Sequence, residues 1–487
     1  MSEAVPPVAR EPKSAHPLGL PPGVHKLGAE TFFGAKLQRY RLDNGLNVLV
    51  LVDKSAPVVS YHTWFRVGSR HERPTKTGLA HLFEHLMFNQ TKNLAPGDFD
   101  KKLEESGAES NAATWVDWTY YYESVPKQRF GLVVELEAER LANLTMEAPQ
   151  VESEKEVVAN ERRYRVDDDV EGAANELLYK TAFEKHSYHA PTIGWMEDIL
   201  AFTPEDCRDF HKAYYAPNNA TLIVVGDVRE ADCMARIAKA YGPIPASTIP
   251  EEDVVPEPPQ TEERHAVLSR PTPSEKALIG YRGPSLGDVD HAPLTVLNEI
   301  LTGGRASRLH RALLTDKELV TEQRGWVSTF RDPGLFEFGL TARIDQPIQP
   351  AIDAFDAEIE RVCAELVSPE ELERAKARLE LGMLQGMDSA AGKAEQIGFY
   401  ETLFGEPTWV ERRLERYRNV GAGEIRTAAR RCLRKEARTI VRVLVADEPD
   451  EPQGEDATEP TTPDATEGAT EPASLAGSRT ESTEVAQ

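Results

Sequence analysis

The stretch GLAHLFEHLMFN, residues 78–89, places two histidines and a glutamate among apolar residues. This pattern constrains the fold strongly, because burying a neutral polar group without a partner costs roughly 2–7 kcal/mol and a carboxylate costs more. On a helix, His81 and His85 lie one turn apart on one face, with Glu84 beside them. A bound metal ion would compensate the burial. The alternative is a helix whose histidines are satisfied by hydrogen bonds in the core.

The three residues His81, Glu84 and His85 spell H-x-x-E-H, the reverse of the zincin motif H-E-x-x-H. Two imidazoles one helical turn apart can bind one zinc ion, and the glutamate can take a proton from water. A catalytic zinc site usually has three protein ligands and one open position. The motif therefore predicts a third ligand elsewhere in the chain, most simply an acid on an inward-facing stripe.

The segment VESEKEVVANERRYR, residues 151–165, contains such acids. At 100° per residue, one stripe of this predicted helix combines apolar and charged residues: Glu154, Val157, Val158, Glu161 and Arg165. The opposite face carries Glu152, Glu156 and Arg163. Two acids on the face of the valines indicate buried roles for Glu154 and Glu161. The alternative is a charged surface helix whose valines make a narrow contact.

Length and charge set broad limits on the fold and on partners. At 487 residues the chain is expected to form two to four domains of roughly 150 residues each. Its 81 acidic residues against 56 Lys and Arg give a net charge of −25, which argues against nucleic acid and anionic membranes as partners. No apolar run approaches the ~18 residues of a membrane span.

Targeting and cysteine usage indicate the compartment. The first residues contain no apolar run of the kind found in secretory signals. Four scattered cysteines form no C-x-x-C and are expected to be reduced. We therefore expect a cytoplasmic protein, or a periplasmic one if a signal has been removed.

The composition along the chain divides it into five parts. Residues 1–36 are rich in Pro and Ala and are expected to be a disordered leader. A metal-bearing half, residues 37–245, is followed by a Pro-rich acidic linker, residues 246–263, and by a second half, residues 264–447. The tail, residues 448–487, has eleven acids and one Arg and is also expected to be disordered.

The two halves look like a duplication. Residues 203–228 and 422–447 both contain an acid-capped helix, a basic turn and an apolar strand. Within the first half, residues 110–126 are β-prone, and the tyrosines at 120–122 are expected to belong to a packed aromatic strand. His186 and His189 could suggest a second metal, but a Pro-containing loop accounts for them better.

Together these motifs resemble the pitrilysin/insulinase family of inverted-motif zinc peptidases, which includes the mitochondrial processing peptidase and two-subunit bacterial members. In that family the third zinc ligand is a glutamate about 76 residues beyond the second histidine, with another glutamate seven residues before it. These positions correspond to Glu161 and Glu154. Residues 107–126, 186–199 and 301–314 also resemble family segments, so the similarity extends from about 38 to 447.

The resemblance implies an α+β fold of two homologous half-domains, each a mainly antiparallel sheet with helices packed on one face. One Zn²⁺ per chain would be bound by His81, His85 and Glu161, with Glu84 as general base and Glu154 orienting a ligand histidine. An extended peptide would pair with a sheet edge at Asn111, Ala112, Ala113, Thr114 and Trp115. Peptides or unfolded segments would be cleaved inside an enclosed chamber.

The second half departs from the family pattern. The family carries an arginine there, followed seven residues later by a tyrosine, and both reach the substrate near the zinc. This chain has Leu314 and Thr321 at the corresponding positions, and no tyrosine between Gly303 and Gly339. The resemblance therefore implies a heterodimer in which a homologous subunit supplies the pair. The alternative is a non-catalytic assembly or core-type subunit of the same fold.

Overall fold

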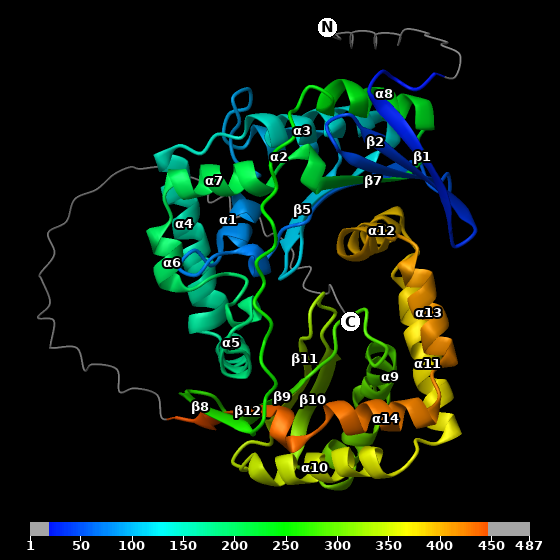
Figure 1. Cartoon of the computed structure of the whole chain (residues 1–487). Coiled ribbons are helices and arrows are strands. Elements are labelled where there is room, and N and C mark those ends of the chain that lie inside the picture. Colours follow the sequence, from blue (N-terminus) through cyan, green and yellow to red (C-terminus); the bar gives the residue numbers. More distant parts are fainter. Residues whose placement is uncertain (1–18, 447–487) are drawn as a thin grey trace, which may run out of the picture.

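The computed structural model describes residues 19–446. Two β-sheets lie one above the other in Figure 1, and helices cover both faces of each. The first sheet consists of β1 (Val24–Phe32), β2 (Ala35–Leu42), β3 (Asn47–Val52), β4 (Val58–Phe65), β5 (Glu109–Thr114), β6 (Thr119–Pro126) and β7 (Ala220–Gly226). The second consists of β8 (Arg264–Arg270), β9 (Lys276–Arg282), β10 (Val320–Val327), β11 (Leu335–Ala342) and β12 (Arg438–Val445).

Strand order relates the two sheets. The first sheet has the order β1-β2-β3-β7-β4-β6-β5 and the second β10-β11-β9-β12-β8. Read from β3 and from β8, the two orders match strand for strand. In both sheets the first pair, β3 with β7 and β8 with β12, is parallel, and the other pairs are antiparallel. Two homologous half-domains with mainly antiparallel sheets are therefore confirmed.

The helices also follow the duplication. The first half contains α1 (Leu79–Leu86), α2 (Asp98–Glu105), α3 (Phe130–Asn143), α4 (Ala148–Arg162), α5 (Val170–Ala182), α6 (Met196–Ala201), α7 (Pro204–Tyr214) and α8 (Glu230–Tyr241). The second contains α9 (His291–Thr302), α10 (Gln349–Ala364), α11 (Pro369–Gln385), α12 (Ala390–Phe404), α13 (Trp409–Asn419) and α14 (Ala422–Cys432). Helices α7 and α14 each lead through a short 3₁₀ turn into corresponding strands of the two sheets, β7 and β12.

The halves exchange one helix each. Helix α12 of the second half packs on β4 and β7 of the first sheet, and α5 of the first half packs on β12, β8 and β9 of the second. Gly398 of α12 makes this approach possible, since an added Cβ would lie 2.0 Å from the indole nitrogen of Trp64. The prediction of helices on one face of each sheet is therefore incomplete, because the other face is covered by the opposite half.

The prediction that residues 1–36 form a disordered leader is wrong from Val24 onward, where strand β1 begins. Strand β1 pairs with β2 through a two-residue turn at Phe33 and Gly34, both with positive φ (44° and 82°). A turn with two positive φ angles matches the twist of a hairpin, and its first position is usually Asn, Asp or Gly. Here that position is Phe33, so the sequence contained no signal for the turn. Residues 1–18 and the predicted tail, residues 448–487, lie outside the described residues.

Residues 246–263 form neither helix nor strand and run between the halves. Glu257 in this segment accepts hydrogen bonds from the backbone N–H groups of residues 184–186 at 2.8–3.1 Å. Glu252 forms an ion pair with Arg331 at 2.6 Å. These contacts attach the segment to both halves, so it is more than a spacer.

Candidate metal centre

The helix that carries the H-x-x-E-H motif, α1, is fixed at its first turn. Gly78 precedes it with φ 94°, and a Cβ there would lie 2.5 Å from the carbonyl oxygen of Ile193. The carboxylate of Glu72 accepts hydrogen bonds from the N–H groups of Gly78 and Ala80 at 2.8 and 2.7 Å. Burial raises the pKa of Glu72 to about 8. Glycine and this carboxylate together set where α1 begins.

The two histidines of α1 meet a glutamate of α4. The rings of His81 and His85 have centroids 5.0 Å apart. One carboxylate oxygen of Glu161, Oε2, lies 3.6 Å from Nε2 of His81 and 3.2 Å from Nε2 of His85. The potential ligand atoms of these three residues all lie within 4.8 Å of one another. The structure thus brings together three residues that the sequence selected as metal ligands.

The inward stripe of α4 is displaced from the predicted one. Val158 is buried and Glu154 and Glu161 are half-buried, as predicted, but Val157 is 45% exposed and Arg165 is also exposed. The buried face instead includes Val151, Lys155, Ala159 and Arg162. The centre of the buried face is therefore rotated about the helix axis, by part of a turn, from the predicted stripe that contains both Val157 and Val158. Val157 and Arg165 were wrongly placed for this reason.

Glu154 lies beside the other ring nitrogen of His85. Its Oε2 atom is 3.9 Å from Nδ1 of His85, and its Oε1 accepts a hydrogen bond from the side chain of Asn89 at 2.8 Å. Asn89 fixes the carboxylate where it can orient the histidine. Arg165 contacts the second oxygen of Glu161 at 3.2 Å. The sequence reading did not identify Glu72, Asn89 or this role of Arg165.

Electrostatics differ among the three clustered residues. Burial lowers the pKa of His81. Burial also opposes the charged form of His85, but the adjacent Glu161 outweighs it and the pKa of His85 is raised. For Glu161, burial is outweighed by His85 and His81, which lower its pKa to about 2. The cluster therefore favours an ionised carboxylate facing two imidazoles.

Glu84 is half-buried on α1 and takes part in no hydrogen bond or ion pair among the described residues. Burial is the main cause that raises the pKa of Tyr120 and Tyr121 on β6, and the nearby charge of Glu84 makes a smaller contribution. The hydroxyl of Tyr121 donates to the carbonyl of Phe83 at 2.9 Å and ties α1 to the sheet. Glu84 is thus a carboxylate without a structural partner, next to the clustered residues.

The donor set fits a zinc ion. Oε2 of Glu161 is buried without a hydrogen-bond partner, although both imidazoles face it. Two imidazole nitrogens and a carboxylate oxygen are usual zinc ligands. Within residues 19–446, this is the one cluster of His, Cys, Asp and Glu with such spacing. His186 and His189 instead bond to Asp332 and to the carbonyl of Phe183.

The predicted peptide-binding residues lie on an edge strand. Strand β5 ends the first sheet and pairs only with β6 among the described strands. Asn111 is exposed and Ala113 half-buried, whereas Ala112 and Thr114 are buried; Trp115 follows the strand and is 42% exposed. The backbone from Asn111 to Thr114 therefore has one edge without a strand partner among the described residues, although the N–H of Ala112 donates to the side chain of Asn111 at 2.9 Å. The tyrosines of β6 form a packed aromatic strand, with Tyr120 and Tyr121 buried.

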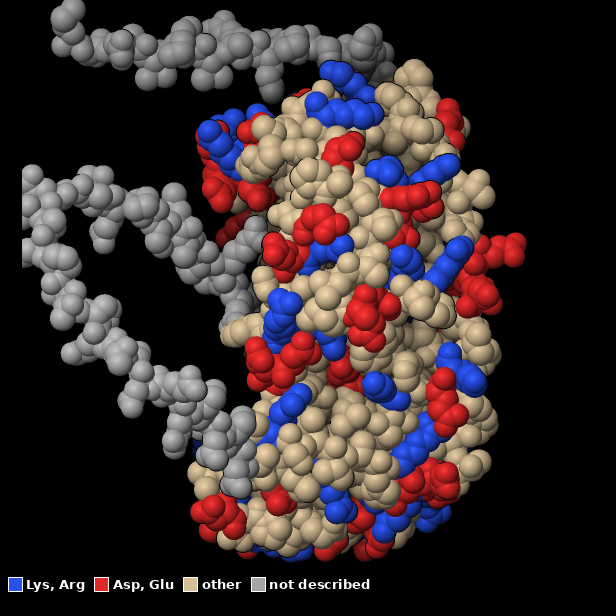
Figure 2. Space-filling model, turned by 90° about the vertical axis from the view of Figure 1, so that its left-hand side faces the viewer, with Lys and Arg blue, Asp and Glu red and all other residues tan. Residues whose placement is uncertain are grey.

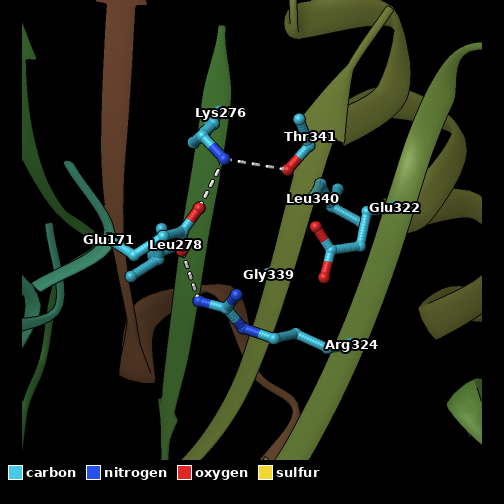
Figure 3. A pocket seen from close by; sticks show the side chains of 8 residues that line it. All are labelled: Glu171, Lys276, Leu278, Glu322, Arg324, Gly339, Leu340 and Thr341. Atoms are coloured by element: carbon cyan, nitrogen blue, oxygen red, sulfur yellow. Dashed lines mark hydrogen bonds and ion pairs between the residues drawn. The ribbon is translucent and has the colours of Figure 1, made fainter. Parts of the chain in front are cut away.

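The positions expected for an arginine and a tyrosine contain no substitute. Leu314 lies in a π-helical turn, His310–Asp316, and packs against the second core. Thr321 is exposed on β10. On the α5 side of this sheet, the two basic residues drawn in Figure 3, Lys276 and Arg324, are both bound to Glu171.

On the face drawn in Figure 2, basic and acidic side chains are interspersed, so this face has no large patch of one charge. Oppositely charged side chains also pair, as Lys76 does with Asp206 at 2.7 Å. In the part of the chain that the structure describes, every helix is too short or too polar to cross a membrane.

Comparison with known proteins identifies the family. The family model described as insulinase (peptidase family M16) matches residues 47–194, and the model of the M16 inactive domain matches residues 201–379. The zinc protease PqqE of Helicobacter pylori is 30% identical over 75% of this chain and 83% of its own. The chain belongs to the M16 peptidase family. The uncharacterized zinc protease YmxG of Bacillus subtilis is 24% identical over 76% of this chain and 89% of its own.

Solved structures agree with this assignment. A protease from Helicobacter pylori superposes with a TM-score of 0.81 at 27% identity, covering 84% of this chain and all of that one. The periplasmic protease PqqL of Escherichia coli superposes with a TM-score of 0.70 at 20% identity, which supports the fold alone. The matched region covers 88% of this chain but 48% of PqqL, so PqqL is about twice as long.

Proposed function

We propose that this M16 chain is the zinc-bearing subunit of a metalloendopeptidase that hydrolyses peptides or unfolded segments. The observation that carries the proposal is the convergence of His81, His85 and Glu161 within 4.8 Å, next to the unpaired carboxylate of Glu84. Its relatives are named zinc proteases, which supports zinc as the cofactor. One Zn²⁺ per chain is the simplest stoichiometry for the one such cluster in residues 19–446.

His81, His85 and Glu161 would hold the zinc, leaving one coordination position for water or substrate. A bound zinc would polarise the scissile carbonyl and make water more acidic. Glu84 takes the proton of the attacking water and passes it to the leaving amine. Glu154 keeps His85 in the orientation that exposes Nε2 to the metal.

The peptide binds along the outer edge of β5, from Asn111 to Thr114, and ends beside the exposed side chain of Trp115. Backbone hydrogen bonds at a sheet edge hold an extended segment without demanding a particular sequence. This mode suits peptides and unfolded segments and excludes folded proteins, whose backbone is already paired. Activity also requires the peptide to be aligned and its developing oxyanion to be stabilised.

Those last functions come from a homologous partner in a heterodimer, which also closes a chamber around the peptide. Leu314 and Thr321 can supply neither a cation nor a phenol. The match covers 48% of the PqqL chain, so PqqL is long enough to contain a second unit of this size. We keep a cytoplasmic location as part of the proposal, although PqqL itself is named as periplasmic.

A non-catalytic assembly or core-type subunit is the second candidate. The incomplete second half favours it, and the intact cluster on α1 and α4 opposes it. Zinc analysis of the purified chain separates the two, together with peptide hydrolysis measured alone and after mixing with an M16 homologue that has the arginine–tyrosine pair. The proposal predicts bound zinc, slow hydrolysis alone and fast hydrolysis at a one-to-one ratio. Absence of zinc, or no hydrolysis in any mixture, would favour the assembly role.

A further inference from the structure

Helix α12 brings a carboxylate of the second half to the first sheet. On this helix Ala394 and Ile397 are buried in the apolar cluster that contains Trp64 and Tyr120. Phe399 meets the ring of Trp118 edge-on, with centroids 6.4 Å apart. Glu395 is one turn before Phe399 and therefore lies on the same side of the helix. This side of α12 faces the aromatic side chains of β4 and β6, which include Trp64 and Tyr120.

The face below Glu395 is made of stacked rings. Trp64 and Tyr120 are parallel, with centroids 4.1 Å apart and an interplanar angle of 4°. The ring of Tyr122 stacks on that of Tyr120, with centroids 5.6 Å apart. Tyr122 is opposite Asn111 of the edge strand β5. Tyr122 and Phe399 are only half-buried, so this aromatic face reaches solvent beside the edge strand.

Glu395 differs from the other charged residues of its helix. Lys393 is paired with Asp53 at 2.6 Å, and Glu401 with Arg39 at 2.6 Å. Glu395 has no hydrogen bond or ion pair within the described part of the chain. Burial raises the pKa of Glu395. The pKa of Tyr120 is raised mainly by its own burial and, to a smaller extent, by the charge of Glu395. A half-buried carboxylate is thus available next to an aromatic surface.

The register of β5 connects this surface to the proposed peptide path. Ala113 is opposite Tyr120 and Asn111 is opposite Tyr122 in the β5–β6 ladder. Ala113 belongs to the α12-side cluster, whereas Ala112 belongs to the core beneath α1. Successive side chains of a strand point to opposite faces. A peptide paired with the outer edge of β5 therefore projects every second side chain onto the α12 side.

We propose that Glu395 is a specificity-determining residue, which selects lysine or arginine at one position of the peptide strand bound along β5. This inference rests on the proposed function and names the substrate preference of that site. A long basic side chain can lay its aliphatic stem over Tyr122 and Phe399 and place its charge between an aromatic face and the carboxylate. The small side chain of Ala113 leaves room for it.

The experiment measures peptide binding in a background that does not hydrolyse the peptide. The zinc-loaded Glu84→Gln chain is titrated with fluorescent, N-acetylated peptides of one length that are neutral except for a single Arg, moved through successive positions. The same series is measured with Glu395→Gln added. Glu373→Gln is the control, since Glu373 on α11 is exposed and paired only with Lys376 in the same helix.

One Arg position should lower Kd by about 10-fold relative to the neutral peptide, the scale of one charge-assisted hydrogen bond. Glu395→Gln should abolish this gain and leave Kd for the neutral peptide unchanged, whereas Glu373→Gln should preserve the gain. As a second variant, Glu395→Lys should transfer the preference to a peptide with Glu at that position.

An Arg preference that survives in Glu395→Gln, or no Arg preference at all, would overturn the role of Glu395 while leaving peptide binding at β5 intact. No binding of any peptide to any variant would overturn the inference together with the proposed use of the β5 edge. The two failures are therefore distinguishable.

Discussion

Nε2 of His85 lies 3.2 Å from Oε2 of Glu161, although the two residues belong to different helices and are far apart in the sequence. The carboxylate oxygen has no hydrogen-bond donor there, so the contact is best satisfied by a cation shared with His81. The proposed zinc site, general base and peptide path all depend on this approach of α4 to α1.

The first prediction concerns the third ligand. Glu161→Gln should lose most bound zinc, because an amide oxygen is a weaker donor than a carboxylate. Glu152→Gln on the same helix is the matched control, since Glu152 is exposed and paired only with Lys155. Metal analysis of both purified variants gives the comparison. Equal zinc content would show that Glu161 is an ordinary helix acid.

The second prediction concerns the residue behind His85. Glu154→Gln should keep the fold and weaken zinc binding by about 10–100-fold, the usual effect of removing a partner that orients a ligand. Competition with a chelator of known affinity measures this loss. Glu156→Gln, an exposed change on the same helix, should have no effect. An unchanged affinity in Glu154→Gln would remove Glu154 from the metal site.

The third prediction tests how α1 is placed. Gly78→Ala should lower the free energy of unfolding by about 2 kcal/mol more than Gly97→Ala and also weaken zinc binding. Both glycines precede a helix with positive φ, so both changes incur about 1–2 kcal/mol of backbone strain. Only Gly78 has backbone within 2.5 Å of the added Cβ; Gly97 has nothing within 4 Å. Urea unfolding of both variants decides it, and equal losses would contradict the steric account.

The fourth prediction uses the contact between the halves. Asp332 accepts hydrogen bonds from Arg70 at 2.6 Å and His186 at 3.1 Å. The hydrogen bond with His186 is the main cause that lowers the pKa of Asp332, and burial opposes it. Because the folded-state pKa lies below the unfolded value of about 3.9, the stabilisation is present above that value. It is lost as the pH falls through the folded-state pKa.

Asp332→Asn should therefore lower the free energy of unfolding by about 1–2 kcal/mol at neutral pH, and the difference from wild type should shrink at about pH 3 and below. Zinc-free protein avoids interference from metal release. Asp209→Asn, an exposed change on α7, should show no such pH dependence. A difference that stays constant with pH would mean that the charge of Asp332 contributes nothing.

The motif and the position of Glu161 beside it could be predicted because their signals are local or set by family spacing. His81, Glu84 and His85 lie within one turn and a half, and Glu161 stands on a helix with visible periodicity. The same periodicity misplaced Val157, since two adjacent valines cannot fix the centre of a helix face to better than part of a turn.

Other features carried no local signal. Strand β1 is an edge strand that buries little beyond Val24 and Phe32, so its pattern is mostly polar. The exchange of α5 and α12 between halves depends on tertiary packing, such as Gly398 against Trp64, which no periodicity encodes. Glu72 and Asn89 lie in loops, where an isolated polar residue indicates nothing about its partner.

The central claim, catalysis by a general base at a zinc site, is tested most directly by Glu84→Gln. With the complementing homologue present, hydrolysis of a quenched fluorescent peptide and zinc content are measured on the same samples of variant and wild type. The account predicts unchanged zinc and a loss of activity of at least 10²–10⁴-fold, the usual contribution of a positioned general base. Near wild-type hydrolysis by a zinc-loaded Glu84→Gln chain would contradict it.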